Sequence, residues 1–173
     1  KKKNILILLP QVAVLNQQRL PNSKGLIDFL KNLDGLLVNS GNYFIRPKTN
    51  YKIEEFQQLI KNEHVNFVLS DKCSTSELIS MVDLVVAPAG SGAVCECSLL
   101  RKKVIGYDYF GRYLSKYWIR YGKDACLDNV DDLKNVLLKY LTNETVEVNW
   151  EKLWDEVVYP NNGNTNQIIE GMI

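Results

Sequence analysis

The sequence alternates between short apolar runs rich in β-branched residues and longer segments whose apolar residues recur at helical spacing. A short, continuous apolar run bounded by turn residues is typical of a strand that is buried on both faces of a parallel sheet. The runs predict strands at residues 4–9, 43–46, 65–69, 83–87 and 104–107, with a short extended piece at 125–127. The helical spacing predicts helices at residues 23–39, 53–61, 75–81, 93–101, 113–121, 130–141, 150–158 and 165–172.

This alternation predicts one α/β domain over residues 1–173, a length that suits a single domain. Right-handed crossovers between parallel strands favour a doubly wound, Rossmann-like parallel sheet flanked by helices, with further helices at the C-terminus. In such sheets ligands bind outside the carboxyl ends of the strands, near the point where the strand order reverses. Candidate functional residues are therefore sought where the strands end.

The exit of the fourth predicted strand is the most informative. Gly90, Ser91 and Gly92 form a turn between a buried strand and a helix that includes Glu96. Glycines allow phosphates to approach the backbone, and free amides at a helix N-terminus receive them. Ser91 adds a hydroxyl, and Glu96 is placed to accept hydrogen bonds from ribose hydroxyls. A helix cap whose glycines serve only the turn is the alternative interpretation.

Other strand exits add charged side chains to the same edge. Arg46 and Lys48 follow the second strand, Asp71 follows the third, and Asp108 follows the fifth. Cations beside a phosphate-binding turn suit an anionic, hydroxylated ligand. A surface arginine and lysine beside a turn is the alternative for Arg46 and Lys48.

Residues 83–107, DLVVAPAGSGAVCECSLLRKKVIGY, resemble the donor-site block of GT-B glycosyltransferases of the bacterial surface or capsular polysaccharide type. Related blocks occur in UDP-N-acetylglucosamine epimerases and in the peptidoglycan N-acetylglucosaminyl transferase. The resemblance implies that Ser91 and Gly92 hold the pyrophosphate and that Glu96 holds the ribose. It also implies that the loop at residues 69–73, which contains Asp71, lies against the nucleobase.

The segment Arg46-Pro47-Lys48 is similar to the Arg-Pro-His-Pro element of these transferases, with Lys48 where the family has histidine. By this resemblance Arg46 and Lys48 are the candidate catalytic residues, which stabilise the departing phosphate. Lysine neutralises a phosphate as a point charge rather than as a donor of fixed geometry. No metal or separate cofactor is expected, because the nucleotide sugar is itself the substrate.

Composition and charge exclude several other classes. The 21 Lys and Arg nearly balance the 20 Asp and Glu, which argues against a general nucleic-acid-binding protein. No segment approaches the roughly 20 apolar residues of a membrane span. The four cysteines match no zinc spacing, and Cys95 and Cys97 point to different helix faces. The single histidine, His64, precedes the third strand and so lies at the wrong edge for catalysis.

The sequence therefore predicts the donor-binding half of a two-domain glycosyltransferase, which binds a UDP- or CMP-activated sugar for transfer to a surface polysaccharide or other glycan. The expected partner is an N-terminal acceptor domain or a separate chain, and the isolated domain should bind donor without efficient turnover. The expected location is the cytoplasm, with any contact to the inner face of the membrane made by the missing half. Two alternatives stay open: a nucleotide-sugar epimerase-like domain, and a non-catalytic subunit that retains the fold to bind a partner.

Overall fold

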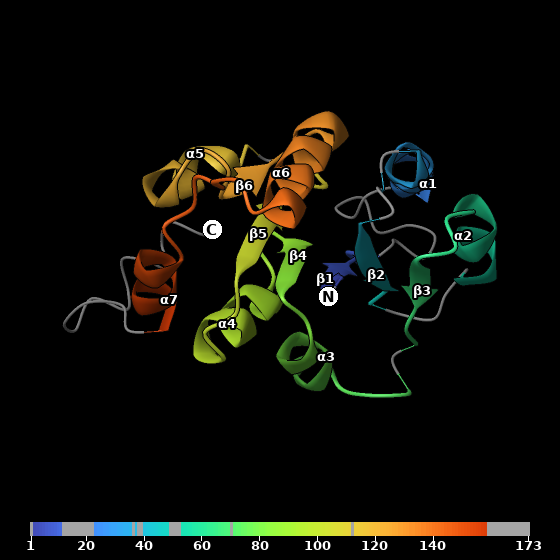
Figure 1. The fold of residues 1–173 in the computed structure, drawn as a ribbon, viewed down its shortest axis with the longest axis horizontal. Coiled ribbons are helices and arrows are strands. Elements are labelled where there is room, and N and C mark those ends of the chain that lie inside the picture. The colour runs from blue at the N-terminus through green and yellow to red at the C-terminus, as the bar shows by residue number, and fades with distance from the viewer. Residues whose placement is uncertain are drawn as a thin grey trace.

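The computed structural model describes residues 2–11, 23–35, 37, 40–48, 53–69, 71–111 and 113–158. Its strands form one sheet in the order β3-β2-β1-β4-β5-β6, and every neighbouring pair is parallel (Figure 1). The strand bounds are β1 (Lys3–Leu8), β2 (Gly41–Arg46), β3 (Val65–Phe67), β4 (Leu84–Pro88), β5 (Val104–Tyr107) and β6 (Cys126–Leu127). This order is that of a doubly wound, Rossmann-like fold, as the sequence predicts.

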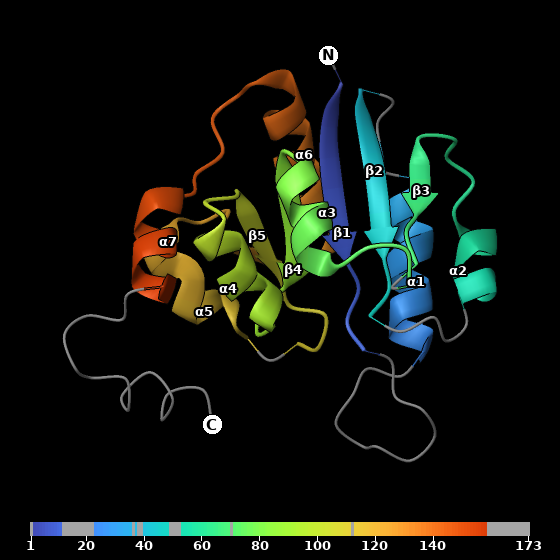
Figure 2. The same ribbon diagram turned by 90° about the horizontal axis from the view of Figure 1, so that it is seen from below.

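Helices cover both faces of the sheet (Figure 2). One face packs against α1 (Ser23–Asp34), α2 (Ile53–Leu59) and α6 (Val130–Thr142), and the other against α3 (Thr75–Met81) and α4 (Gly92–Leu99). Beyond β5 the chain forms α5 (Ser115–Trp118), the 3-10 helix η1 (Ile119–Tyr121) and α7 (Trp150–Val158). No helix in the described ranges is long and apolar enough to cross a membrane.

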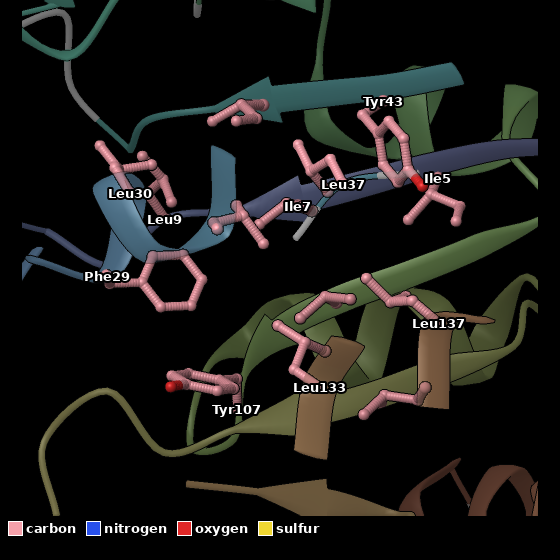
Figure 3. Packing of buried hydrophobic residues seen from close by; sticks show 14 of the residues in the cluster. Ile5, Ile7, Leu9, Phe29, Leu30, Leu37, Tyr43, Tyr107, Leu133 and Leu137 are labelled. Atoms are coloured by element: carbon pink, nitrogen blue, oxygen red, sulfur yellow. The ribbon is translucent and has the colours of Figure 1, made fainter. Parts of the chain in front are cut away.

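The core has one layer on each face, because alternate residues of each strand point to opposite sides. Figure 3 shows the first layer, in which Ile5 and Ile7 of β1 belong to the same cluster as Phe29 of α1 and Leu133 of α6. The second layer holds Leu6 and Leu8 against α3 and α4. Strands buried on both faces explain why the sequence runs for β1, β4 and β5 are continuous rather than alternating.

The strands and helices of the sequence prediction are present in the described ranges, with shifted ends. Helix α1 ends at Asp34 rather than near residue 39, directly before Gly35, a residue type that is unfavourable inside a helix. The Asp34 carboxylate accepts hydrogen bonds from the amides of Lys61 and Asn62. The helix predicted at 113–121 is instead a single turn, α5, followed by η1. The helix predicted at 165–172 lies outside the described residues.

Chain direction creates a crevice between β1 and β4. From β1 the chain crosses to β2 on one side, and from β4 it crosses to β5 on the other, so the two connections diverge at the carboxyl ends. The strand arrows in Figure 2 point to this lower edge of the sheet. The fold therefore places the exits of β1, β2, β4 and β5 around one opening.

Candidate anion-binding cleft

A cleft of about 460 Å³ occupies this edge of the sheet. Its walls come from the exits of four strands, from the first residue of α3, and from the first turns of α4. Six of the residues predicted for the site line it together: Arg46, Lys48, Gly90, Ser91, Gly92 and Glu96. The predicted residues, which the sequence places at the carboxyl edge of the sheet, therefore lie on one concave surface.

The turn at residues 90–92 leads directly into α4. The amide of Ser91 donates to the carbonyl of Pro88 at 2.9 Å, which closes the turn, whereas the amides of Gly92 and Ala93 donate to no described residue. Ser91 is the N-cap residue, but its side chain makes no capping hydrogen bond. The first amides of a helix carry partial positive charge, so this end of α4 presents unsatisfied donors to the cleft.

The Ser91 hydroxyl oxygen is buried and has no hydrogen-bond partner in the described structure. Leaving a buried hydroxyl unpaired costs roughly 1–3 kcal/mol. A sequence optimised only for the fold would use this side chain to cap α4. The orphaned hydroxyl is therefore available to hydrogen-bond a group that enters the cleft.

Neither glycine of the turn is required by the fold. The positive-φ glycines of the described chain are Gly111 and Gly122, so Gly90 and Gly92 adopt conformations that other residues tolerate. A Cβ on Gly90 would lie 3.7 Å from Leu114, which is an ordinary contact, and a Cβ on Gly92 would meet nothing within 4 Å. The open space beside Gly92 is space in the cleft, where a ligand can approach the backbone.

Arg46 is a buried cation in the cleft wall. Arg46 is the last residue of β2, and only 8% of it is exposed. Its Nη1 donates a hydrogen bond to the Cys73 carbonyl at 2.7 Å. No carboxylate of the described residues forms an ion pair with it. Buried charges are normally paired, and so this guanidinium is suited to an anion that enters the cleft. Lys48, by contrast, is exposed at the rim.

Glu96 is held by α3. The Ser76 hydroxyl donates to Glu96 Oε2 at 2.7 Å, and Oε1 accepts no hydrogen bond from a described residue. A capping box fixes the start of α3: Ser74 Oγ accepts from the Glu77 amide, and the Glu77 carboxylate accepts from the Ser74 amide. These hydrogen bonds lower the pKa of Glu77 below its ordinary value. The box thereby orients Ser76, and Ser76 orients the carboxylate of Glu96, which lines the cleft.

Two acidic residues at this edge differ in their placement. Asp71 is exposed and does not line the cleft, so the structure does not bring it together with the other predicted residues. Asp108 is 3% exposed and does line the cleft. Its carboxylate accepts hydrogen bonds from the amides of Phe110 and Leu114, and thus orders the loop after β5.

Sequence reasoning missed Thr75, which also lines the cleft. Thr75 is hidden in the sequence because it belongs to a capping box, a pattern that signals only a helix start. Tyr107 also lines the cleft. Its position at the exit of the fifth predicted strand places it at this edge, but the sequence assigns it no individual role.

The remaining candidate chemistry does not gather at the cleft. His64 precedes β3 at the amino edge of the sheet, where its backbone carbonyl accepts from Tyr43. All four cysteines are free thiols, and Cys95 is exposed whereas Cys97 is buried, as their spacing predicts. Burial raises the pKa of the Cys97 thiol to about 12, which makes it unreactive. In the described ranges no three His, Cys, Asp or Glu side chains are grouped to hold a metal ion.

No protein-family model and no curated protein matches this sequence. The roles of the cleft residues therefore depend on their geometry.

Proposed function

We propose that this domain binds a nucleotide-activated sugar and presents it for transfer to a glycan acceptor, as the donor half of a glycosyltransferase. The observation that carries the proposal is the convergence, in one cleft, of a buried guanidinium that forms no ion pair with a described carboxylate and of the α4 amides that donate to no described residue. A phosphate or diphosphate satisfies both groups and also offers oxygens to the orphaned Ser91 hydroxyl. The resemblance of residues 83–107 to GT-B donor sites supports the same class of ligand.

Each cleft residue has a defined part in the proposed complex. The Gly92 and Ala93 amides and Arg46 bind the diphosphate, and Lys48 approaches it from the rim. Glu96 Oε1 accepts hydrogen bonds from the ribose hydroxyls, while Oε2 stays bonded to Ser76. The cleft volume of about 460 Å³ falls in the range of small-molecule sites, which is about 300–1,000 Å³.

The chemistry that this arrangement supports is departure of the nucleotide. Breaking the glycosidic bond to the diphosphate leaves extra negative charge on the phosphate oxygens. Preorganised donors aimed at that charge lower the barrier, and here they are the helix amides, Arg46 and Lys48. A base that activates the acceptor hydroxyl belongs to the proposed acceptor half, so we expect the isolated domain to bind donor with little turnover.

Calorimetric titration with UDP, CMP, GDP and CDP tests the proposal. We expect one of these nucleotides to bind, and Glu96→Ala to weaken it by more than about 1 kcal/mol, the scale of one hydrogen bond to a charged group. Glu63→Ala is the matched control, because Glu63 is an exposed carboxylate next to His64 at the amino edge. If no nucleotide binds at millimolar concentration, the proposal is wrong.

A non-catalytic, partner-binding subunit is the second candidate, and one observation favours it. Tyr113, Tyr117 and Ile119 are more than half exposed and lie close together in sequence around α5. Exposed apolar groups of this kind are typical of surfaces that a partner covers. This candidate predicts no nucleotide binding, so the same titration separates the two functions. The epimerase-like alternative gains no support, since His64 is remote from the cleft.

A further inference from the structure

A small pocket of about 180 Å³ adjoins the main cleft on the side of β5 and β6. Pro10, Tyr107 and Asp108 line both spaces, so the pocket is a lateral extension of the cleft rather than a separate cavity. Its remaining walls include the aromatic rings of Phe29 and Tyr109. The phosphate-binding turn and this pocket therefore stand side by side at the same edge of the sheet.

The Tyr107 hydroxyl has no hydrogen-bond partner among the described residues, although the residue is only 5% exposed. Figure 3 shows this hydroxyl directed toward the carboxyl end of the sheet, where Leu9 and Phe29 lie. Tyr109 packs edge-on against Tyr107, with ring centroids 4.6 Å apart, but its hydroxyl donates to the Leu8 carbonyl at 3.2 Å. Of these two neighbouring tyrosines, Tyr109 bonds to the backbone through its hydroxyl, whereas Tyr107 lines the pocket and its hydroxyl bonds to no described residue.

Two carboxylates give the pocket its charge. Asp108 is buried and its oxygens accept backbone hydrogen bonds, whereas Asp128 is exposed just after β6. Burial, followed by the charges of Asp128 and Asp108, raises the pKa of Tyr107. The tyrosine therefore stays protonated and remains able to donate. The cations of the cleft, Arg46 and Lys48, line the main cleft but not this pocket.

We infer that this pocket holds the sugar of the donor and selects a neutral, hydroxyl-rich sugar over one that carries a carboxylate. The inference rests on the proposed donor-binding function and narrows its substrate class. Sugar hydroxyls donate to Asp128 and exchange hydrogen bonds with Tyr107, and the ring packs against the aromatic wall. A carboxylate on the sugar would instead meet two negative charges, which favours UDP-activated neutral sugars over CMP-activated sugars, because the latter are commonly carboxylic acids.

Titration of the protein with UDP, UDP-glucose and UDP-glucuronate tests this inference, since the two sugars differ only by a carboxylate at one carbon. We expect UDP-glucose to bind more tightly than UDP, and UDP-glucuronate to bind less tightly than UDP-glucose. Asp128→Asn should reduce the preference for glucose over glucuronate roughly fivefold, as removal of repulsion in solvent-exposed surroundings predicts. Asp131→Asn, an exposed carboxylate of α6 outside the pocket, is the matched control.

Tyr107→Phe provides a second, independent measurement. Because the hydroxyl has no partner in the described structure, its removal should leave thermal stability unchanged while it lowers the extra affinity that UDP-glucose has over UDP. If UDP binds but the three ligands bind alike in wild type and variants, the pocket is not a sugar subsite and only this inference fails. If CMP binds and UDP does not, the inference is again wrong. If neither binds, the proposed function itself fails.

Discussion

Single residues show which features of the cleft serve the fold and which do not. Gly122 has φ +125°, and a Cβ there would lie 1.9 Å from the Glu147 carbonyl oxygen. Gly92 has neither a positive φ nor a neighbour within 4 Å of its added Cβ. The first glycine is therefore structural, and the second is free to serve a ligand.

Gly122→Ala should destabilise the protein by about 3 kcal/mol or more, because the methyl group collides with backbone and the conformation is strained. Gly111→Ala is the control: Gly111 also has a positive φ, +61°, but a Cβ there would meet nothing within 4 Å. Its cost should be only about 1–2 kcal/mol. Urea unfolding measures both, and equal losses would show that the close approach of Glu147 does not constrain residue 122.

Two buried thiols give stability a defined dependence on pH. Burial is the main cause that raises the pKa of Cys97 and of Cys126 from 9.0 to about 12. Above pH 9.0 the unfolded chain loses thiol protons that the folded chain retains, so stability falls as the pH rises from about 9 toward about 12. Urea unfolding at pH 7, 9 and 10 should show this fall, and a Cys97→Ala/Cys126→Ala variant should show a smaller one. An unchanged slope in that variant would contradict the assignment.

At the scale of elements, the sequence pattern predicts those helix starts and strands that depend only on neighbouring residues. The capping box at Ser74 and Glu77 and the apolar runs of β1, β4 and β5 are contained in a few adjacent residues, and the structure confirms them. The Asp34 carboxylate at the end of α1 bonds to the amides of residues 61 and 62, a contact between segments far apart in the sequence. Such tertiary contacts cannot be located from local pattern.

The same distinction applies to the candidate site. The glycines, Ser91 and Glu96 could be singled out because they follow a strand and begin a helix. The burial of Arg46, its bond to Cys73 and the hydrogen bond from Ser76 to Glu96 join three separate exits, and so only the folded chain shows them. Asp71 illustrates the converse, since a position after a strand does not ensure that a side chain reaches the cleft.

At the scale of the whole molecule, the strand order places the unsatisfied groups where β1 and β4 diverge. Both core layers are filled by continuous apolar strands and by helices on each face. The cleft contains the residues that do not follow this pattern: the buried Arg46, the Ser91 hydroxyl without a described partner, and Gly90 and Gly92, whose conformations do not require glycine. Departures from local optimisation that cluster at one edge are expected at a binding site, because selection for function opposes selection for stability there.

The Gly92→Ala variant tests whether stability and ligand binding oppose each other at this position. Alanine should raise the stability of the free protein, by at most about 1 kcal/mol, because it suits the first position of α4 better than glycine and meets no neighbour. The same methyl group stands in the cleft and should remove the rise in Tm that UDP gives the wild type, since a ligand stabilises only by binding the folded state. Thermal unfolding with and without UDP measures both effects. A variant that is destabilised, or that keeps the full UDP-induced rise, would show that Gly92 serves the turn and not a ligand.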